Sequence, residues 1–123
     1  MRLWHYKLIR NLPRAQLLGQ HRECCALRGK GWGKKHSTVD YVFEHPYIML
    51  FDYHKKVIAE MERRGHKVYA AWKDPHYRGT QLGVVDNLPN ENKLRHPVYP
   101  EHTNKYLSEC IENILEKQSR GLS

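Results

Sequence analysis

Apolar residues recur at helical spacing in three stretches of the chain, and these stretches predict its main elements. The first begins at Pro13, because proline suits the first helical position, and continues to about Leu27, after which glycine ends it. The second and strongest starts at Pro46 and stops at Gly65. Its apolar stripe is formed by Leu50, Tyr53 or His54, Val57, Ile58 and Met61. The core of the protein is therefore expected to be built on this second helix.

The third helical stretch lies near the C-terminal end, from about Pro100 to Gln118. The side chains expected to face inward are Leu107, Cys110, Ile111, Ile114 and Leu115. The glutamates at positions 109, 112 and 116 are expected to face outward. The amphipathic pattern therefore predicts a helix that packs along one side.

The segments between these helices have no sustained periodicity. Residues 2–9 show no clear alternation and are expected to be extended or irregular. Residues 29–36 hold three glycines and three lysines around Trp32 and predict a flexible basic loop. Ser37 with Asp40 resembles a capping box that opens a short helix to about Glu44. Residues 66–99 are rich in Gly, Pro and Asn and predict a loop with a short strand at residues 67–71.

The sequence therefore predicts a mostly α fold: a compact single-domain bundle of about three main helices, with an irregular N-terminal segment and long loops. A chain of 123 residues is long enough for one core and too short for two, so residues 1–123 are expected to form one domain. No apolar run approaches the roughly 20 residues that a membrane-spanning helix needs, and no signal-peptide pattern is found at the N-terminus. We therefore expect a cytoplasmic protein without a membrane partner.

Cysteine and histidine usage gives little sign of a metal centre. Three cysteines, Cys24, Cys25 and Cys110, are an odd number and suggest reduced thiols and no disulfide framework. Nine histidines are present, but neither a CxxC nor an HExxH motif is found. His21 and Cys25 are four residues apart and would share a helix face, a spacing that packing explains more often than ligation. We expect no metal and no cofactor.

Positive charge is concentrated at the start of the chain. The net charge is +8, and residues 1–40 hold nine Lys/Arg against two acidic residues, which leaves only +1 for the remainder. Solubilising charge would normally be dispersed, whereas a phosphate-binding face concentrates it. The asymmetry therefore favours a nucleic-acid partner.

One carboxylate stands inside this positive region. Glu23 precedes every other acidic residue in the chain, and it directly follows Arg22 on the first predicted helix. The cationic neighbours are expected to lower the pKa of Glu23 and to keep it ionised at neutral pH. From the residues alone, Glu23 is either an ion-pair partner or a catalytic group.

The sequence around Glu23 resembles the phage-type pyrimidine-dimer DNA glycosylases, also called phage endonuclease V. The resemblance comprises the N-terminal MRL, LPRAQLLGQHRECC with its Arg22-Glu23 pair, KKH at 34–36, HKKVIAEMERRGHKV at 54–68 and YPEHTNKYLSECIENILEK at 99–117. These stretches cover something over half the chain in the family's order. Each is too short to be specific alone, and their order and spacing make the case.

The resemblance implies a DNA-repair glycosylase with associated AP lyase activity. In that family the backbone α-amine of the first residue attacks C1′ of the damaged nucleotide and forms an imine intermediate. β-Elimination then breaks the strand, and a glutamate about one helix away assists these steps. Carried over to this chain, Met1 supplies the amine, Glu23 is the acid/base partner, and Arg2 and Arg22 are catalytic-site or phosphate-binding cations. Where the best-known members expose a threonine after methionine removal, here Arg2 follows Met1, and methionine is generally retained before so large a residue.

The resemblance breaks down at the C-terminus. The family's tail rich in tyrosine and tryptophan is absent, and the chain ends in KQSRGLS, which puts pyrimidine-dimer specificity in doubt. The residues that could replace its stacking surfaces are Trp32, Tyr69, Trp72 and Tyr77. For Tyr69 and Trp72 we favour a role in the core over stacking on DNA. For Trp32, which lies on a loop, the core role is less favoured.

The implied partner is damaged double-stranded DNA, bound by a monomer. The residues assigned to DNA contacts are Arg14, Arg28, Lys30, Trp32, Lys34, Lys35 and His36, with solvated charge or an internal hydrogen bond as the alternative.

A second hypothesis is a basic nucleic-acid-binding module without catalysis. A third, a nuclease that uses histidines or a metal, is disfavoured because the sequence has no carboxylate cluster.

Overall fold

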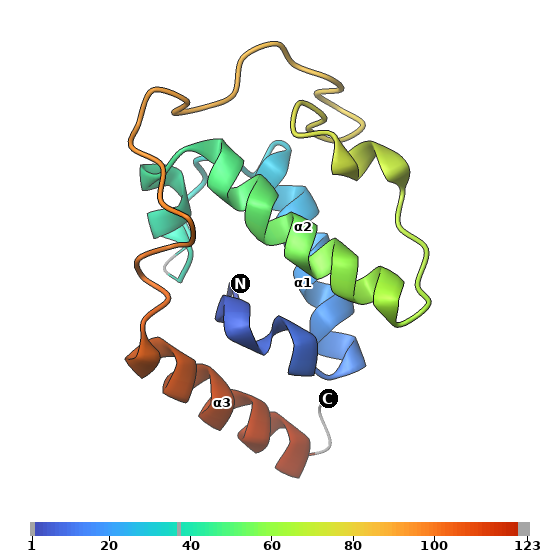
Figure 1. Ribbon diagram of the computed structural model, residues 1–123, viewed down its shortest axis with the longest axis vertical. Helices are drawn as coiled ribbons and strands as arrows, with labels where there is room; N and C mark the ends of the chain where they lie inside the picture. The colour runs from blue at the N-terminus through green and yellow to red at the C-terminus, as the bar shows by residue number, and fades with distance from the viewer. Residues whose placement is uncertain (1, 37, 121–123) are drawn as a thin grey trace.

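The computed structural model describes residues 2–36 and 38–120, and over these residues the protein is mostly helical with three main helices (Figure 1). The elements in chain order are the 3-10 helix η1 (Tyr6–Asn11), α1 (Arg14–Arg28), the 3-10 helix η2 (Asp40–Glu44), α2 (Tyr47–Arg63), the 3-10 helix η3 (Ala70–Lys73) and α3 (Asn104–Ser119). The predicted mostly α fold with three main helices is confirmed.

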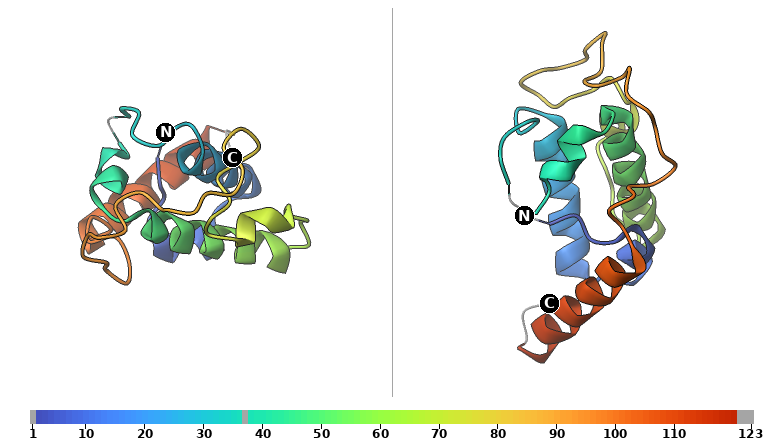
Figure 2. Two further views of the ribbon diagram at one scale, coloured as in Figure 1. Left: turned by 90° about the horizontal axis from the view of Figure 1, so that it is seen from above. Right: turned by 90° about the vertical axis from the view of Figure 1, so that its left-hand side faces the viewer.

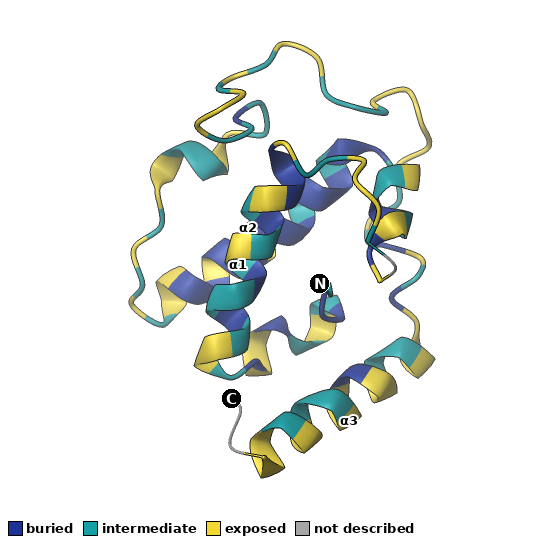
Figure 3. Cartoon of the chain, turned by 180° about the vertical axis from the view of Figure 1, so that it is seen from behind, coloured by how far each residue is buried: buried dark blue, intermediate teal, exposed yellow. Residues whose placement is uncertain are grey.

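Helices α1 and α2 form the centre of the molecule and pack against each other, while α3 lies below them against η1 (Figures 1 and 2). The faces that α1 and α2 turn toward each other are the most deeply buried part of the chain (Figure 3). All six residues proposed for the apolar stripe of α2 are buried. The prediction that the core is built on this helix is confirmed.

The ends of α1 and α2 follow the residues that predicted them. Pro13 and Pro46 stand at the N-caps of the two helices. Gly65, two residues beyond α2, has a φ of +91°, a left-handed conformation that glycine adopts without strain. Proline at the start and glycine after the end therefore set both boundaries of α2.

The N-terminal segment is more ordered than the sequence suggested. Residues 6–11 form η1, whose first turn is capped by His5, because its Nδ1 accepts a hydrogen bond from the Lys7 N–H at 3.1 Å. Leu3 and Trp4, just before it, are buried. The expectation of an irregular stretch over residues 2–9 is therefore wrong from Tyr6 onward, because a histidine side chain supplies the cap.

Two buried histidines fasten this segment to the start of α3. The Tyr6 N–H donates to Nδ1 of His102 at 3.2 Å, so the neutral His102 carries its proton on Nε2 and donates it to the Tyr41 hydroxyl at 2.8 Å. Nε2 of His5 donates in turn to the His102 carbonyl at 3.0 Å. Residues almost one hundred positions apart are joined in this way, and the first residues of the chain are held inside the fold.

Helix α3 is shorter and less buried than predicted. It begins at Asn104, where the Thr103 hydroxyl accepts from the Tyr106 N–H, and Cys110 is its buried residue. Ile111 and Leu115 were expected to face inward, but they are 40% and 59% exposed. That part of the prediction is wrong because α3 packs along a narrow face, in which Cys110 is buried and Ile114 packs against the core, while Ile111 and Leu115 lie toward solvent.

The connections between the helices depart from the sequence patterns in two places. No strand forms at residues 67–71, where η3 begins at Ala70, because the segment has no neighbouring strand to pair with in the described part of the chain. Further along the same connection, a single antiparallel β-bridge joins Tyr77 and Val84. Before η2, the Asp40 carboxylate accepts from the His36 N–H at 2.6 Å, and Ser37 of the proposed capping box lies outside the described residues.

Within residues 2–36 and 38–120, no helix is both long and apolar enough to cross a lipid bilayer.

The buried histidines predict a loss of stability in mild acid. Burial and the nearby Arg28 lower the pKa of His54 to about 2, and burial and His5 lower the pKa of His102 to about 3. Both are neutral in the folded protein but take up a proton in the unfolded chain below about pH 6.5. Their contribution to stability is therefore complete above that pH and is lost as the pH falls toward 3 and 2, by about 1.4 kcal/mol per pH unit for each histidine.

We expect the free energy of unfolding in urea to fall steeply between pH 6.5 and pH 5. The control is His102→Gln, which should be less stable at pH 8 but should have a shallower pH dependence than the unsubstituted protein. An unfolding free energy that stays flat across this range would contradict the assignment.

Candidate active site

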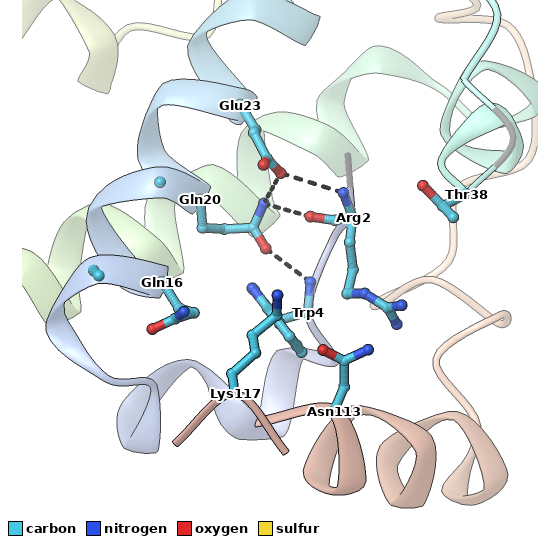
Figure 4. A pocket seen from close by; sticks show the side chains of 10 residues that line it. Arg2, Trp4, Gln16, Gln20, Glu23, Thr38, Asn113 and Lys117 are labelled. Carbon is cyan, nitrogen blue, oxygen red and sulfur yellow. Dashed lines mark hydrogen bonds between the residues drawn. The ribbon is translucent and has the colours of Figure 1, made fainter. Parts of the chain in front are cut away.

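A pocket of about 420 Å³ lies where the N-terminal segment, α1 and α3 meet. Figure 4 shows Glu23 and Gln20 on α1, Arg2 and Trp4 on the N-terminal segment, and Asn113 and Lys117 rising into the pocket from α3. The remaining lining residues are Ala15, Gln16, Gly19 and Thr38. Four separate parts of the sequence, of which Thr38 is one, therefore build one pocket around the carboxylate that the sequence singled out.

The Glu23 carboxylate is half-buried and is held from two sides. The Arg2 N–H and the Gln20 side-chain amide both donate to its Oε2, each at 3.3 Å (Figure 4). Burial raises the pKa of Glu23, and the Arg2 N–H and the nearby positive charges only partly offset it. The expectation that cationic neighbours would lower the pKa of Glu23 is therefore wrong, since removal from water has the larger effect. A carboxyl group with a raised pKa is better suited to giving and taking a proton near neutral pH.

Gln20 is the residue that holds this arrangement together. Its side chain is 1% exposed, and its Oε1 accepts from the Trp4 N–H at 2.7 Å, while its Nε2 donates to the Arg2 carbonyl at 3.0 Å. The Tyr53 hydroxyl, which donates to the Trp4 carbonyl at 2.6 Å, also lies 3.0 Å from Gln20 Oε1. Every polar atom of the amide thus has a partner of the right kind, and both ends of residues 2–4 are fixed to α1.

The other residues assigned to catalysis have different surroundings. Arg2 is half-buried in the pocket, with its guanidinium 5.3 Å from the centre of the Trp4 ring. Arg22 is exposed on α1 beside Glu23. Met1, the proposed source of the amine, lies outside the described residues.

Sequence reasoning assigned Arg2 and Glu23 to a site and missed the other residues that line this pocket, among them Gln20, Thr38, Asn113 and Lys117. A signal existed for three of these four. Asn113 and Lys117 fall on the helical stripe that continues from the buried Cys110, where polar side chains are unexpected unless they face a polar cavity. Gln20, one helical turn before Glu23, could have been proposed as its neighbour.

Arg28 is a structural residue, and its assignment to DNA phosphates is wrong. Its side chain is fully buried, and its N–H groups donate to the Tyr47 hydroxyl, to Nδ1 of His54 and to the carbonyls of Trp72, Asp74 and Tyr77, at 2.8 to 3.0 Å. The guanidinium also lies 4.9 Å from the centre of the Trp72 ring. With all its donors satisfied internally, Arg28 fastens the segment after α2 to the end of α1.

His21, Cys25 and His54 bring three potential metal-ligand atoms within 4.8 Å of one another. The guanidinium of Arg28 can only donate, so Nδ1 of the neutral His54 accepts, and its Nε2 carries the proton that it donates to His21 at 2.8 Å. A metal would need a lone pair on that same Nε2. The bond from Arg28 therefore favours a series of hydrogen bonds from Arg28 through His54 to His21 over a metal centre.

The basic residues assigned to DNA contacts are mostly on the surface. Arg14, Lys30, Lys34 and Lys35 are exposed. Trp32 is half-buried and makes edge contacts with Phe43 and Tyr47, so its loop is anchored on the core. His36, four residues after Trp32, is also half-buried.

The aromatic residues after α2 lie partly on the surface. Tyr77 is buried, whereas Tyr69 is 66% exposed. The expectation that Tyr69 is a core residue is therefore wrong.

Comparison with known proteins bears on the pocket directly. Residues 1–74 match the family described as pyrimidine dimer DNA glycosylase. The chain belongs to the pyrimidine dimer DNA glycosylase family. No curated protein and no solved structure matches it significantly.

Membership in this family implies a DNA glycosylase that acts on DNA. The matched segment contains Arg2, Gln20 and Glu23, and it ends before α3. The half of the pocket around Glu23 therefore lies within the family match, whereas Asn113 and Lys117 lie outside it.

A single substitution tests the role of Gln20. In Gln20→Glu the acceptor oxygen is retained, but the donor is replaced by a carboxylate oxygen that faces the Arg2 carbonyl and Glu23. We expect a stability loss of about 2–3 kcal/mol at pH 8, because two buried acceptors lose their donor. The loss relative to the unsubstituted protein should shrink as the pH is lowered to 5, where one carboxyl group is protonated; a pH-independent difference in urea denaturation would argue against this geometry.

The exposed lysines of the loop after α1 are testable as phosphate contacts. We expect Lys34→Gln with Lys35→Gln to reduce the slope of log binding constant against log salt concentration by about 1.8, because each phosphate contact contributes about 0.9. Binding to a duplex oligonucleotide would be measured by fluorescence anisotropy at several salt concentrations. Lys105→Gln, on the exposed start of α3, is the matched control and should leave the slope unchanged. Equal slopes for all three proteins would remove the loop from the DNA interface.

Proposed function

We propose that this protein is a DNA-repair glycosylase with AP lyase activity, in which the α-amine of residue 1 is the nucleophile and Glu23 its acid/base partner. The observation that carries the proposal is the hydrogen bond at 3.3 Å between the Arg2 backbone N–H and the Glu23 carboxylate, at the wall of a pocket of about 420 Å³. The start of the chain and the one early glutamate meet at that point.

Covalent geometry extends this observation to the amine itself. Three bonds separate the nitrogen of residue 1 from the nitrogen of Arg2, which limits their separation to about 3–4 Å whatever the conformation. We therefore assign the amine and the Glu23 carboxylate to one substrate nucleotide, whose sugar would lie between the two groups.

An α-amine suits nucleophilic attack at physiological pH. Its ordinary pKa is about 7.7–8.0, so a substantial fraction is neutral without the large shift that a lysine would need. The neutral amine attacks C1′ of the damaged nucleotide, the bond from C1′ to the base breaks, and the base leaves with the bonding pair. Opening of the C1′–O4′ bond, with a proton delivered to O4′, leaves a protonated imine between the amine and C1′.

Strand cleavage follows from the imine. The positive imine nitrogen acidifies the C2′ hydrogen, a base removes that proton, and the C3′–O bond breaks with departure of the 3′ phosphate. The raised pKa of Glu23 suits both steps, because a protonated carboxyl group can donate to O4′ and the resulting carboxylate can assist the removal of the C2′ proton. As a carboxylate it also stabilises the positive charge that develops at C1′.

The cations around the pocket supply affinity for the substrate. Arg2 and Lys117 line the pocket, and the exposed Arg22 stands on the same helix as Glu23. We assign these residues, with the exposed Arg14, Lys30, Lys34 and Lys35, to the phosphates that flank the lesion in duplex DNA. A nucleotide that is attacked at C1′ has to be accessible, and damaged bases leave the stack at lower cost than intact ones.

Borohydride trapping tests the proposal. The protein is incubated with duplex DNA carrying either an abasic site or a thymine dimer, in the presence of borohydride, which reduces an imine to a stable amine. We expect a covalent complex with the abasic duplex, and digestion with mass spectrometry should place the cross-link on the amine of residue 1.

Two variants complete this experiment. Glu23→Gln should lower strand cleavage at least 100-fold, whereas Glu112→Gln, an exposed glutamate on α3, should leave it unchanged. Binding without any trapped complex would instead identify a basic nucleic-acid-binding module without catalysis. A cross-link on a lysine would move the nucleophile away from the N-terminus.

A further inference from the structure

We propose that a groove between η1 and α2 binds an acidic segment of a partner protein, one that carries a large apolar side chain among its carboxylates. The groove has a volume of about 330 Å³ and is lined by residues of these two elements. It shares no lining residue with the pocket around Glu23. The inference therefore does not depend on the chemistry proposed for that pocket.

The groove lies on the face of α2 opposite the contact with α1. Its residues on α2 have the spacing of one side of a helix, and they are Lys56, Ala59, Glu60 and Arg63. His54, which hydrogen-bonds to His21 of α1, lies about half a turn around the helix from this group. The right-hand view of Figure 2 shows α1 on one side of the molecule and α2 on the other. A ligand in the groove would therefore leave the pocket around Glu23 open.

The floor of the groove is apolar. Tyr6 is half-buried, Ile9 is buried, and the exposed Ala59 lies between the longer side chains of Lys56 and Arg63. The short alanine leaves room in which an aliphatic or aromatic side chain of a ligand can be removed from water. The phosphates of a second DNA segment would gain nothing from such a floor. The floor therefore favours a peptide with an apolar side chain over another duplex.

The rim of the groove is positively charged. Arg10, Lys56 and Arg63 are exposed and line it, and Lys7 is exposed on the same 3-10 helix as Arg10. Glu60 is the acidic residue among the lining residues, so three cations stand against one carboxylate. This excess of charge attracts an acidic ligand and disfavours a basic one.

Glu60 fixes the arginines of this rim in position. Its side chain is 7% exposed, and its carboxylate accepts from Arg63 Nε at 3.0 Å and from Arg63 Nη2 at 2.6 Å. The same carboxylate accepts from Arg64 Nε at 2.7 Å, and Arg64 Nη2 donates to the Arg10 carbonyl at 3.0 Å. Arg63 remains 56% exposed, so part of its guanidinium is open to a carboxylate of the ligand. One buried acid thus orients two arginines and joins α2 to the end of η1.

The length of the groove sets the length of the ligand. Lys56 and Arg63 are separated along the axis of α2 by about 10 Å, from a rise of about 1.5 Å per residue. An extended peptide advances about 3.3 Å per residue, so about three or four of its residues span this distance. A segment with carboxylates on both sides of one apolar residue therefore matches the rim and the floor together. Arginine clusters recognise acidic motifs in this manner.

Titration with a designed peptide tests the inference on the full chain. The probe is a short peptide with two aspartates on each side of a central phenylalanine, and binding is followed in ¹H–¹⁵N spectra at physiological salt. We expect saturable binding with a dissociation constant below about 1 mM. The largest shifts should be those of the backbone amides of Ile9, Arg10 and Ala59, while the signals of Gln20 and Glu23 stay in place.

Two control peptides separate the rim from the floor. In one, asparagine replaces each aspartate, which removes the charge; in the other, glycine replaces the phenylalanine, which removes the apolar side chain. Each change should weaken binding at least about tenfold. Equal binding of the three peptides would overturn the inference.

Two charge-matched double variants locate the bound peptide. Arg10→Gln with Lys56→Gln should weaken binding of the aspartate peptide about tenfold and leave binding of a lesion duplex unchanged. Both side chains are exposed, so the fold should be retained, and thermal unfolding checks this. Lys34→Gln with Lys35→Gln, an equal loss of charge on the loop after α1, should leave binding of the peptide unchanged.

Competition with DNA decides between the two classes of ligand. The peptide and a lesion duplex should bind together, so the shifts of Ile9 and Ala59 should persist when the protein is saturated with duplex. Displacement of the peptide by the duplex, or shifts confined to residues 22–35, would place the peptide on the DNA-binding face and overturn the inference. A duplex that itself shifts Ile9 and Ala59 would identify the groove as a second DNA contact and would overturn it as well.

Discussion

The side-chain amide of Gln20 is the constraint on which the functional site depends. It is buried, and it bonds to the backbone on both sides of Leu3 and to the carboxylate of Glu23. A peptide segment at the start of a chain normally frays, because few contacts tie it down. Here one amide gives it two hydrogen bonds, and the histidines of residues 5 and 102 hold it from the other side. The Glu23 carboxylate and residues 2–4 are therefore held in fixed positions relative to each other.

A second constraint is the buried charge of Arg28. Among the residues that the structure describes, no carboxylate pairs with it; its partners are three backbone carbonyls, a tyrosine hydroxyl and a neutral histidine. A buried cation is costly unless each donor is satisfied, and removing partners from a buried charge typically costs 3–5 kcal/mol. The segment from Trp72 to Tyr77 supplies those carbonyls, so a stretch with little regular structure is nevertheless held firmly against α1. Arg28 also decides which nitrogen of His54 carries the proton, and so it shapes the environment of His21 and Cys25.

The parts of the fold that could be predicted from sequence are those set by local periodicity. The two long helices of the centre followed from the spacing of apolar residues and from proline and glycine at their ends. Glu23 was found because it is the first acid in a basic region and because its surroundings resemble a known family. What escaped prediction depends on contacts between distant positions: the amide bonds of Gln20, the burial of Arg28 and the reach of Lys117 into the pocket. The raised pKa of Glu23 belongs with them, because neighbours in sequence indicate charge but not exclusion of water.

Because of the position of α3, the two sides of the pocket come from different parts of the chain. Residues on α1 and on the N-terminal segment surround the carboxylate, whereas α3 rests on η1 and adds Asn113 and Lys117 from the opposite side. Substitutions on α3 can thus reshape the space offered to a nucleotide while the carboxylate keeps its own hydrogen bonds. Under the proposed function, the residues assigned to bond breaking and the α3 residues that shape the space for the nucleotide lie more than eighty positions apart in the sequence, so substitutions on α3 would change lesion preference and leave the Glu23 carboxylate in place.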